Sequence, residues 1–424
     1  MKKYDLIIAG AGAAGLMAAL SASREGMSVL LLEKMEKAGR KIRITGKGRC
    51  NITNTRPWNE FSTHIHPKSN TLKHAFHSFS NTDTIKLFEE IGLPVTVERG
   101  ERAYPSSGKA QDVVNALTAE LDRKGVEIRY NSKVTKFNVL DGLIISVDWQ
   151  ESVTDKSAKT NSFIISTGGL SYPLTGSDGD GYKLAENAGH TIIPCLPSLT
   201  ALMPLKYDSS LSGLSLKNVS LKLFVGKDRV QEEFGDIEFT SNGLEGPLGL
   251  RISRKAVKAI SSGNKVFAEI DLKPALSEDQ IIARIKREFP SDGKMRLTDL
   301  LRKLMPGQLI IPFVNSSGLV QSKILSLQLS GEIYKIADLL KNWRLEITGY
   351  TSFERCVITA GGVSLDEIIP KTMASRLLPN LFFAGEVVDL DGDTGGYNLQ
   401  IAFSTGYLAG KSASYFVKKS KMVI

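Results

Sequence analysis

The chain has 424 residues, of which 42% are hydrophobic and 23% are charged. This length exceeds that of one ordinary domain, and the composition excludes a disordered or fibrous protein. The net charge of +9 indicates a solvated surface with some anion-binding residues or, as an alternative, a nucleic-acid-binding surface. No apolar run approaches the ~20 residues that cross a bilayer, and Asp5 interrupts the apolar start, which argues against a signal peptide.

The cysteines and histidines give no strong signal for a metal or a disulfide. Cys50, Cys195 and Cys356 form no CxxC pair, and an odd count is a poor disulfide framework, so we expect a cytoplasmic protein. In the HIH stretch (64–66), the spacing would suit a metal, but no carboxylate or thiol stands nearby in sequence. We therefore expect a solvated loop at this stretch.

The first element is a buried strand over residues 4–9, which runs into GAGAAG and then a helix. The next strand ends in Glu33, 18 positions after Gly15. This order of strand, GxGxxG, helix, strand and acid predicts a dinucleotide site: Gly10 makes the tight turn, Gly12 admits a pyrophosphate, and Gly15 lets the helix pack closely. Glu33 is expected to accept hydrogen bonds from an adenosine ribose, which disfavours the 2′-phosphate of NADP.

A basic, glycine-rich stretch follows in residues 37–54. It is too rich in glycine and charge for another helix–strand unit, so we expect a loop. Such a loop can wrap a second phosphate and a ribityl chain, which favours FAD over NAD; a solvated basic loop is the alternative. Cys50 beside Arg49 could be a redox thiol, but without a second cysteine nearby a packed residue near the cofactor is the favoured reading.

The middle of the chain continues an α/β pattern and then changes. Residues 71–91 and 108–124 are predicted as helices, and the strand at 163–169 is expected to meet the nucleotide at its end. Beyond His190, period-two alternation predicts an antiparallel β-barrel or sheet, which helices with Pro and Gly breaks follow. The stretch ADLLKNWRLEITGY (337–350) is read as a return to strands.

We therefore predict an α/β protein with a Rossmann-like FAD-binding domain of the glutathione-reductase type, interrupted by an inserted β-barrel with a small helical subdomain. The FAD-binding domain is expected to comprise residues 1–192 and 346–424, the insertion 193–345, and the helical subdomain about 274–325. The insertion contains no second strand–GxGxxG–helix unit. If NAD(P)H is the electron donor, it must visit the flavin from solvent.

A second glycine-led helix start lies near the end of the chain, in GDTGGYNLQ (392–400). A strand ahead of it ends in Gly385 and Glu386, which we expect at the ribityl and pyrophosphate part of FAD. One helix N-terminus would neutralise phosphate. The other, at Gly395 and Gly396, would face flavin N1 and the C2 carbonyl, where negative charge develops on reduction.

Three stretches carry a family resemblance: GRKIRITGKGRCNITN (39–54), FIISTGGLSYPLTGSDGDGYKLAENAGH (163–190) and the segment 370–410. They resemble the HI0933-like flavoproteins of the two-dinucleotide-binding-domain superfamily. The resemblance implies tightly bound FAD and an oxidoreductase, and Glu386 departs from the Asp that many flavoproteins of the superfamily carry. The residues expected to bind the cofactor are Gly10, Gly12, Ala13, Ala14, Gly15, Glu33, Arg40, Lys41, Gly48, Arg49, Cys50, Asn51, Val134, Thr167, Gly168, Gly169, Gly385, Glu386, Asp393, Gly395, Gly396, Tyr397, Asn398 and Leu399.

The reaction expected is hydride exchange between flavin N5 and a small organic substrate, with no protein nucleophile. NAD(P)H-dependent reduction of a conjugated C=C bond in a 3-oxo steroid-like compound is one hypothesis, and oxygen-dependent oxidation of a small amine such as aminoacetone is another. An RNA-modifying flavoenzyme and a flavin-bound sensor remain alternatives, the former because of basic residues in 251–265. Tyr172 and Tyr397 are candidate proton donors, and no catalytic residue or metal ligand is assigned.

Overall fold

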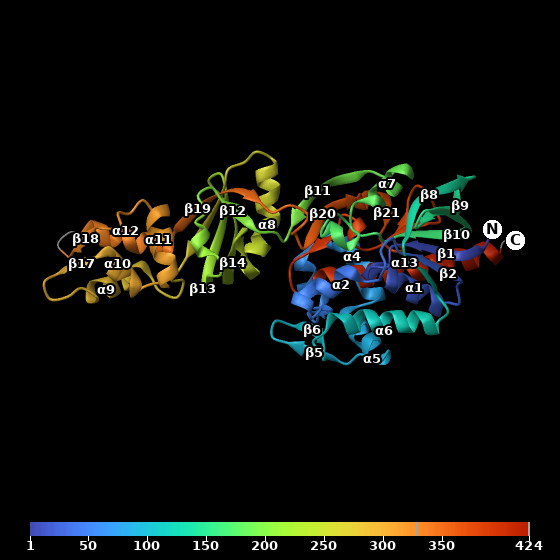
Figure 1. Ribbon diagram of the computed structural model, residues 1–424, viewed down its shortest axis with the longest axis horizontal. Helices are drawn as coiled ribbons and strands as arrows, with labels where there is room; N and C mark the ends of the chain where they lie inside the picture. The colour runs from blue at the N-terminus through green and yellow to red at the C-terminus, as the bar shows by residue number, and fades with distance from the viewer. Residues whose placement is uncertain (328–329, 423–424) are drawn as a thin grey trace. The chain divides into compact units, whose positions relative to one another are not determined.

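The computed structural model describes residues 1–327 and 330–422. This part of the chain forms two compact units, Met1–Leu196 with Phe353–Ile424 and Pro197–Ser352. The chain thus leaves the first unit and returns to it. Each unit is described by itself, with labels as in Figure 1.

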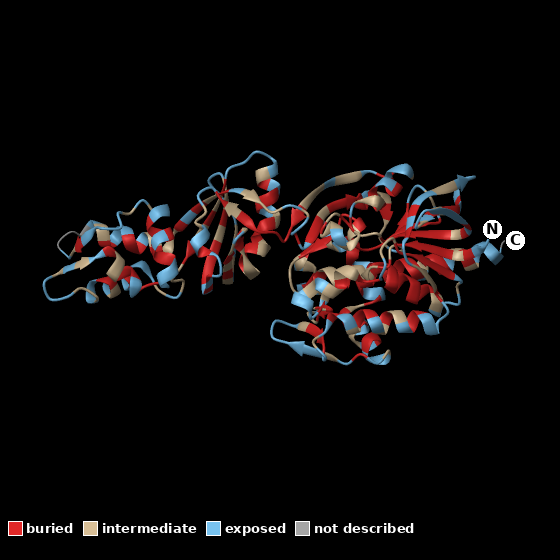
Figure 2. Ribbon diagram, in the orientation of Figure 1, coloured by how far each residue is buried: buried red, intermediate tan, exposed pale blue. Residues whose placement is uncertain are grey.

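Nine described strands form the main sheet of the first unit, and five of them pair in parallel as its core. The core strands, in spatial order, are β7 (Glu127–Arg129), β2 (Val29–Leu32), β1 (Lys3–Ala9), β10 (Thr154–Ile165) and β23 (Leu381–Phe383). β21 (Ile368–Ile369) and β22 (Ala374–Ser375) extend one edge, and β8 (Ser132–Leu140) and β9 (Leu143–Glu151) pair beside β10. Figure 2 shows β1, β2 and β23 buried along most of their length, and the end of β10 is buried as well, as expected for parallel strands covered on both faces.

Two long helices pack against each other beside this sheet, α1 (Ala13–Arg24) and α13 (Tyr397–Met422). Glycines make the close approach possible. A Cβ on Gly406 would lie 2.3 Å from the Ala14 carbonyl oxygen, and one on Gly410 would lie 2.3 Å from the Ala18 carbonyl oxygen. The two glycine-led helix starts therefore belong to one packed helix pair, which the sequence alone did not indicate.

The remaining elements of the first unit surround the sheet. The helices are α2 (Arg40–Ile44), α3 (Trp58–Phe61), α4 (Ser69–Ser78), α5 (Asn81–Glu90), α6 (Ala110–Arg123) and α7 (Asp180–Asn187). The short strands are β3 (Thr53–Asn54), β4 (Ile65–His66), β5 (Val95–Glu98), β6 (Arg102–Pro105), β11 (Ile192–Ser198), β20 (Ile358–Val363) and β24 (Asp391–Gly392).

Two predictions for this unit were wrong in detail. The helix predicted over 71–91 is two helices, because Ser80 caps α5: its hydroxyl accepts from the Asp83 N–H while the Asp83 carboxylate accepts from the Ser80 N–H. The stretch 37–54 contains a short helix, α2, on which Ile42 is buried. Only one side chain of α2 is buried, and one apolar residue is too weak a periodic signal for a helix to be predicted from the sequence.

The second unit contains a closed barrel of six described strands, as predicted. Its order is β12 (Leu202–Pro204), β15 (Gly243–Glu245), β14 (Asp228–Thr240), β13 (Ser215–Val225), β16 (Val266–Asp271) and β19 (Trp343–Tyr350). Helix α8 (Gly246–Ser261) packs on the barrel and buries Ile252, Ala256 and Val257. The basic stretch 251–265 therefore lies largely on an amphipathic helix, which the sequence analysis did not predict.

A helical part completes the second unit, with α9 (Glu278–Arg287), α10 (Leu297–Arg302), α11 (Gly307–Ser316), α12 (Ser330–Lys341) and the hairpin β17 (Lys294–Arg296) and β18 (Ile324–Ser326). The reading of 337–350 as a return to strands was wrong for its first part, since α12 continues to Lys341, and right for β19. Ile333, Ile336, Ala337 and Leu340 lie at helical spacing and are all buried.

Candidate functional site

The first glycine turn joins β1 to α1 and leaves the start of the helix open. Gly10 has a φ of +94°, and a Cβ on Gly15 would lie 1.8 Å from the Gly10 carbonyl oxygen. Gly12 differs from both, because no described atom lies within 4 Å of where its Cβ would be. Gly12 is also the N-cap residue of α1, and no described side chain caps this end. The N–H groups at Ala13 and Ala14 therefore remain available to an anion.

Glu33 follows β2 and is 8% exposed. One carboxylate oxygen accepts from the Ala11 N–H at 2.8 Å, and the other accepts from the Met35 N–H at 2.9 Å. Burial raises the pKa of Glu33, although these two N–H groups oppose that effect. The acid thus orders the glycine turn, while its contact with a ribose stays a prediction.

Two arginines of the basic stretch, Arg40 and Arg49, have protein partners that sequence reasoning did not identify. Arg40 donates to the Leu174 carbonyl oxygen at 3.0 Å and pairs with the Glu36 carboxylate at 2.5 Å. Arg49 pairs with Glu98, and its guanidinium lies 4.3 Å from the Tyr104 ring centroid. Gly48, beside Arg49, is exposed and has a φ of +85°.

Lys41 and Glu386 form an ion pair between the two ends of the chain, with 2.7 Å between the ammonium and the carboxylate. Glu386 also accepts from the Ser171 hydroxyl at 2.5 Å and from the Thr359 N–H at 2.9 Å. Gly385 precedes it, and a Cβ there would lie 2.7 Å from the Ala14 Cβ. The end of β23 therefore abuts the start of α1, although the two segments are more than 360 residues apart in sequence.

The end of β10 and the strand β8 supply further predicted residues. The Thr167 hydroxyl is buried, and no described group hydrogen-bonds it. Gly168 has a φ of +80°, and a Cβ on Gly169 would lie 2.6 Å from the Thr359 hydroxyl oxygen. Val134 is 8% exposed, on β8.

Cys50 is fully buried, and burial raises the pKa of its thiol to about 12. A thiol with this pKa is almost entirely protonated at neutral pH, so it is a poor nucleophile. The reading of Cys50 as a packed residue fits this environment, and the redox-thiol alternative does not.

The second glycine turn lies against the basic stretch rather than open to solvent. A Cβ on Gly396 would lie 2.5 Å from the Thr53 carbonyl oxygen and 2.9 Å from Asn51 Oδ1. The Gly395 carbonyl oxygen accepts from the Asn54 amide at 3.1 Å. The Thr53 backbone alone therefore leaves no room for a side chain at position 396, with or without a bound cofactor. Asn51 Oδ1 is buried, and among the described groups none hydrogen-bonds it.

The residues at the start of α13 have different structural roles. The Asn398 side chain closes the preceding loop, since its amide donates to the Gly392 carbonyl oxygen at 2.7 Å and its oxygen accepts from the Gly392 N–H at 2.8 Å. Tyr397 is 3% exposed, and Leu399 packs against the core. Tyr172 lies on another loop, where its N–H donates to the Phe353 carbonyl oxygen.

Two histidines that the sequence analysis assigned to a solvated loop meet Asp393. His64 Nδ1 lies 2.8 Å from Asp393 Oδ2, and His66 Nε2 lies 3.4 Å from Asp393 Oδ1. The i, i+2 spacing of HIH was the one available signal, since it places both side chains on one face of an extended segment. The acid that completes the group is more than 320 residues away in sequence, so this spacing did not identify it.

The comparisons with known proteins address the family. The family model described as HI0933-like protein Rossmann domain matches residues 4–412. This chain belongs to the HI0933-like family. A 3-dehydro-bile acid delta(4,6)-reductase of Clostridium scindens is 30% identical over 96% of this chain and 98% of its own length. A ribosomal RNA dihydrouridine synthase of Haemophilus influenzae is 31% identical over 98% of this chain and 100% of its own length.

A solved structure supports the fold of this HI0933-like protein. The 3-ketosteroid-delta4-(5alpha)-dehydrogenase from Rhodococcus jostii RHA1 covers 97% of both chains at 14% identity, with a TM-score of 0.57. The family and this fold make the protein an FAD-dependent oxidoreductase. Among residues 1–327 and 330–422, no helix combines the length and apolar character that a membrane span requires. Within the same ranges, no three His, Cys, Asp or Glu residues gather as metal ligands.

The described residues fit FAD on three observations. The space at Gly12 and the uncapped start of α1 suit a pyrophosphate. The buried oxygens of Thr167 and Asn51 have unused hydrogen-bonding capacity, which a buried polar group rarely keeps without a ligand. We propose that the first glycine turn and Glu33 would hold the adenosine half, and that Asn51 with the Gly395–Gly396 turn would hold the pyrimidine edge of the flavin.

Proposed function

We propose that this protein reduces a C=C bond conjugated to a carbonyl group, with FAD as the hydride carrier. The observation that carries the proposal is the pair of relatives matched over nearly their whole length. Their names describe different substrates but one kind of chemistry. A 3-oxo-4,6-diene and the uracil ring each have a C=C bond conjugated to a carbonyl, and reduction saturates such a bond.

FAD, when bound, supplies hydride transfer at its N5 position. The chain's own contribution is binding and orientation. The start of α1 offers N–H groups to the pyrophosphate, and Glu33 holds the Gly10–Gly12 turn in shape through Ala11. The Lys41–Glu386 ion pair joins α2 to the end of β23 and so holds two walls of the site together.

For the substrate, we propose a small 3-oxo steroid-like enone first. The full-length likeness to a bile-acid reductase supports this choice. The basic stretch on α8 offers less free charge than its sequence suggests, because the Glu233 carboxylate pairs with Arg251 at 2.7 Å. We propose NAD(P)H as the electron donor, arriving from solvent.

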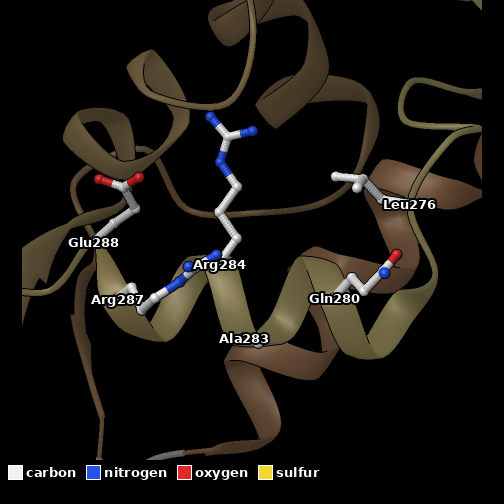
Figure 3. A pocket seen from close by; sticks show the side chains of 6 residues that line it. All are labelled: Leu276, Gln280, Ala283, Arg284, Arg287 and Glu288. Carbon is white, nitrogen blue, oxygen red and sulfur yellow. The ribbon is translucent and has the colours of Figure 1, made fainter.

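Uracil within RNA is the second candidate. The likeness to a ribosomal RNA dihydrouridine synthase and the net charge of +9 support it. The second unit also has an open hollow on α9, lined by Leu276, Gln280, Ala283, Arg284, Arg287 and Glu288 (Figure 3). Its carboxylate is paired, since Glu288 lies 3.1 Å from the Lys303 ammonium, so the two arginines leave the lining cationic.

The test is anaerobic reduction of the FAD-loaded protein by NADH or NADPH, followed by addition of one oxidant at a time. We expect androst-4-ene-3,17-dione to restore the oxidised flavin spectrum, while its 4,5-saturated ketone, the matched control, does not. Reoxidation by a uridine-containing ribosomal RNA fragment alone would select the second candidate. If neither androst-4-ene-3,17-dione nor the RNA fragment reoxidises the flavin, and aminoacetone reduces the oxidised flavin instead, the proposed reaction is wrong.

A further inference from the structure

The group formed by His64, Asp393 and His66, here called the HDH cluster, is the feature that the proposed function leaves unused. Each carboxylate oxygen of Asp393 faces one imidazole, at 2.8 Å for His64 and 3.4 Å for His66. The side chains are partly exposed, at 24% for His64, 30% for His66 and 20% for Asp393. Solvent protons therefore reach a group that is otherwise held firmly.

The fold fixes the HDH cluster through backbone pairing. β4 and β24 pair antiparallel, with His66 opposite Asp391, and the Asp393 N–H donates to the His64 carbonyl oxygen at 3.0 Å. The His64 ring stacks on Tyr397 with 4.5 Å between ring centroids. Tyr397 is the first residue of α13, so the cluster is attached directly to the start of that helix.

Three residues, Thr394, Gly395 and Gly396, lie between Asp393 and the first residue of α13. Asp393 stands two positions before Gly395, and the Gly395–Gly396 turn lies against Asn51 and Thr53. We have proposed that this turn holds the pyrimidine edge of the flavin. Negative charge develops at that edge when the flavin is reduced, and a unit charge about 10 Å away in partly polar surroundings changes a proton affinity roughly tenfold.

The charged groups around the HDH cluster are few and identifiable. Asp391 lies on β24 and is 1% exposed. Lys68, just beyond β4, pairs with Asp366 at 2.7 Å. On β6, Arg102 Nε is 3.8 Å from where a Gly395 Cβ would lie.

The carboxylate itself does not titrate near neutral pH. Burial alone would raise the pKa of Asp393, but hydrogen bonds from His64 and His66 outweigh it and hold the pKa at about 2. Proton exchange by the cluster is therefore assigned to an imidazole, the side-chain type that ordinarily changes its charge in the physiological pH range.

We propose that the HDH cluster takes up a proton, in part of the molecules, when the bound FAD is reduced, and that His64 carries it. The inference rests on the placement of the flavin edge at Gly395–Gly396. The protons balance as follows: a nicotinamide delivers a hydride to the flavin, and water supplies the proton to His64. When the hydride passes on to the β-carbon of a conjugated C=C bond, the stored proton goes to the α-carbon, and the cluster returns to its first state.

Other groups near the glycine turns suit this task less well. Cys50 is buried and its thiol pKa is raised to about 12. Lys41 is paired with Glu386, and Arg49 is paired with Glu98. The imidazoles of His64 and His66 are partly exposed, and each faces one carboxylate oxygen of Asp393.

The experiment measures proton uptake during anaerobic reduction of the FAD-loaded protein by electrochemically supplied electrons, and the midpoint potential as a function of pH. The variants are His64→Gln, His66→Gln and Asp393→Asn, with His74→Gln as the matched control because His74 is exposed on α4. We expect His64→Gln to lose up to about half a proton per two electrons, the most that a tenfold change in the proton affinity of one site produces. This loss lowers the pH slope of the potential by up to about 15 mV per pH unit, half of the ~30 mV that a whole proton contributes for a two-electron couple.

His66→Gln is expected to reduce the uptake less, and His74→Gln is expected to leave it unchanged. A second measurement needs no substitution at the cluster: ¹⁵N-histidine spectra of the native protein should show a higher pKa for His64 in the reduced state than in the oxidised state. Equal proton uptake by the native and His64→Gln proteins, or the same His64 pKa in both states, would overturn the proposal.

A further variant separates the two assumptions. Asn51→Asp adds negative charge where the flavin edge is proposed to lie, so it should lower the potential. An unchanged potential would overturn the placement of the flavin edge, whereas a lowered potential with normal uptake in His64→Gln would overturn the cluster proposal alone. No substrate enters these measurements, so failure of the enone assay leaves them intact.

Discussion

The starts of α1 and α13 differ in what surrounds them, although the two helices pack against each other. In front of α1, the space at Gly12 is open, and Glu33 is turned inward to the backbone. In front of α13, Gly396 is pressed against Thr53, and the HDH cluster stands beside the turn. The first arrangement suits a permanent charge such as a pyrophosphate. The second, with groups that can gain a proton, suits a charge that comes and goes.

The largest effect should follow from a Cβ at the first turn. Gly15→Ala places a methyl group 1.8 Å from the Gly10 carbonyl oxygen, so the strand and helix must separate. We expect a loss of about 3 kcal/mol in the free energy of unfolding, as for severe overpacking. Thermal unfolding of the FAD-free protein measures it. A melting temperature equal to the native one would show that the turn is less rigid than the structure indicates.

Asp393→Asn tests the charge at the second turn. Because the folded pKa of about 2 lies below the ordinary value of 3.8, the carboxylate contributes stability that is present above pH 3.8 and lost as the pH falls toward 2. A shift of this size corresponds to about 2 kcal/mol. Urea unfolding at neutral pH should show this deficit, and it should shrink at acidic pH. An equal deficit at both pH values would contradict the ionic origin.

Gly12→Ala tests whether the open space belongs to a cofactor. The Ala methyl group meets no described atom, so the FAD-free protein should unfold nearly as the native protein does. FAD affinity should fall about tenfold through loss of one charge-assisted hydrogen bond. Equilibrium binding measures this change. The control is Gly307→Ala at the start of α11, where the space around an added Cβ is equally open. Equal FAD affinity in both variants would show that Gly12 does not contact the pyrophosphate.

The smallest effect is expected at Cys50. Its burial and its pKa of about 12 predict that it resists iodoacetamide at about pH 8 in the FAD-loaded protein. Cys195, which is half-buried, should react first. Peptide mass mapping distinguishes them. Rapid labelling of Cys50 would restore the redox-thiol hypothesis.

Much of the fold was predictable because its signals are local. The turn Gly10–Gly15 with Glu33 is confirmed as a strand–turn–helix–strand unit, and the alternation in 216–240 correctly indicated barrel strands. Periodicity failed where a local cap or a short element competed with it. Ser80 divides one apolar helix pattern into two helices. The strand residues at the end of 337–350 led to a strand prediction for the last residues of α12.

The sequence by itself determined the dinucleotide-binding topology and the family, because backbone conformation and the period of apolar residues depend on residues close together in the chain. Only the tertiary structure decided which charges meet. Lys41 pairs with Glu386, and His64 with Asp393, across more than 320 positions. No local pattern records such a pair, since the spacing between its members depends on the whole intervening chain. The ionic character of the site is therefore a property of the folded molecule, whereas its position in the fold is a property of the sequence.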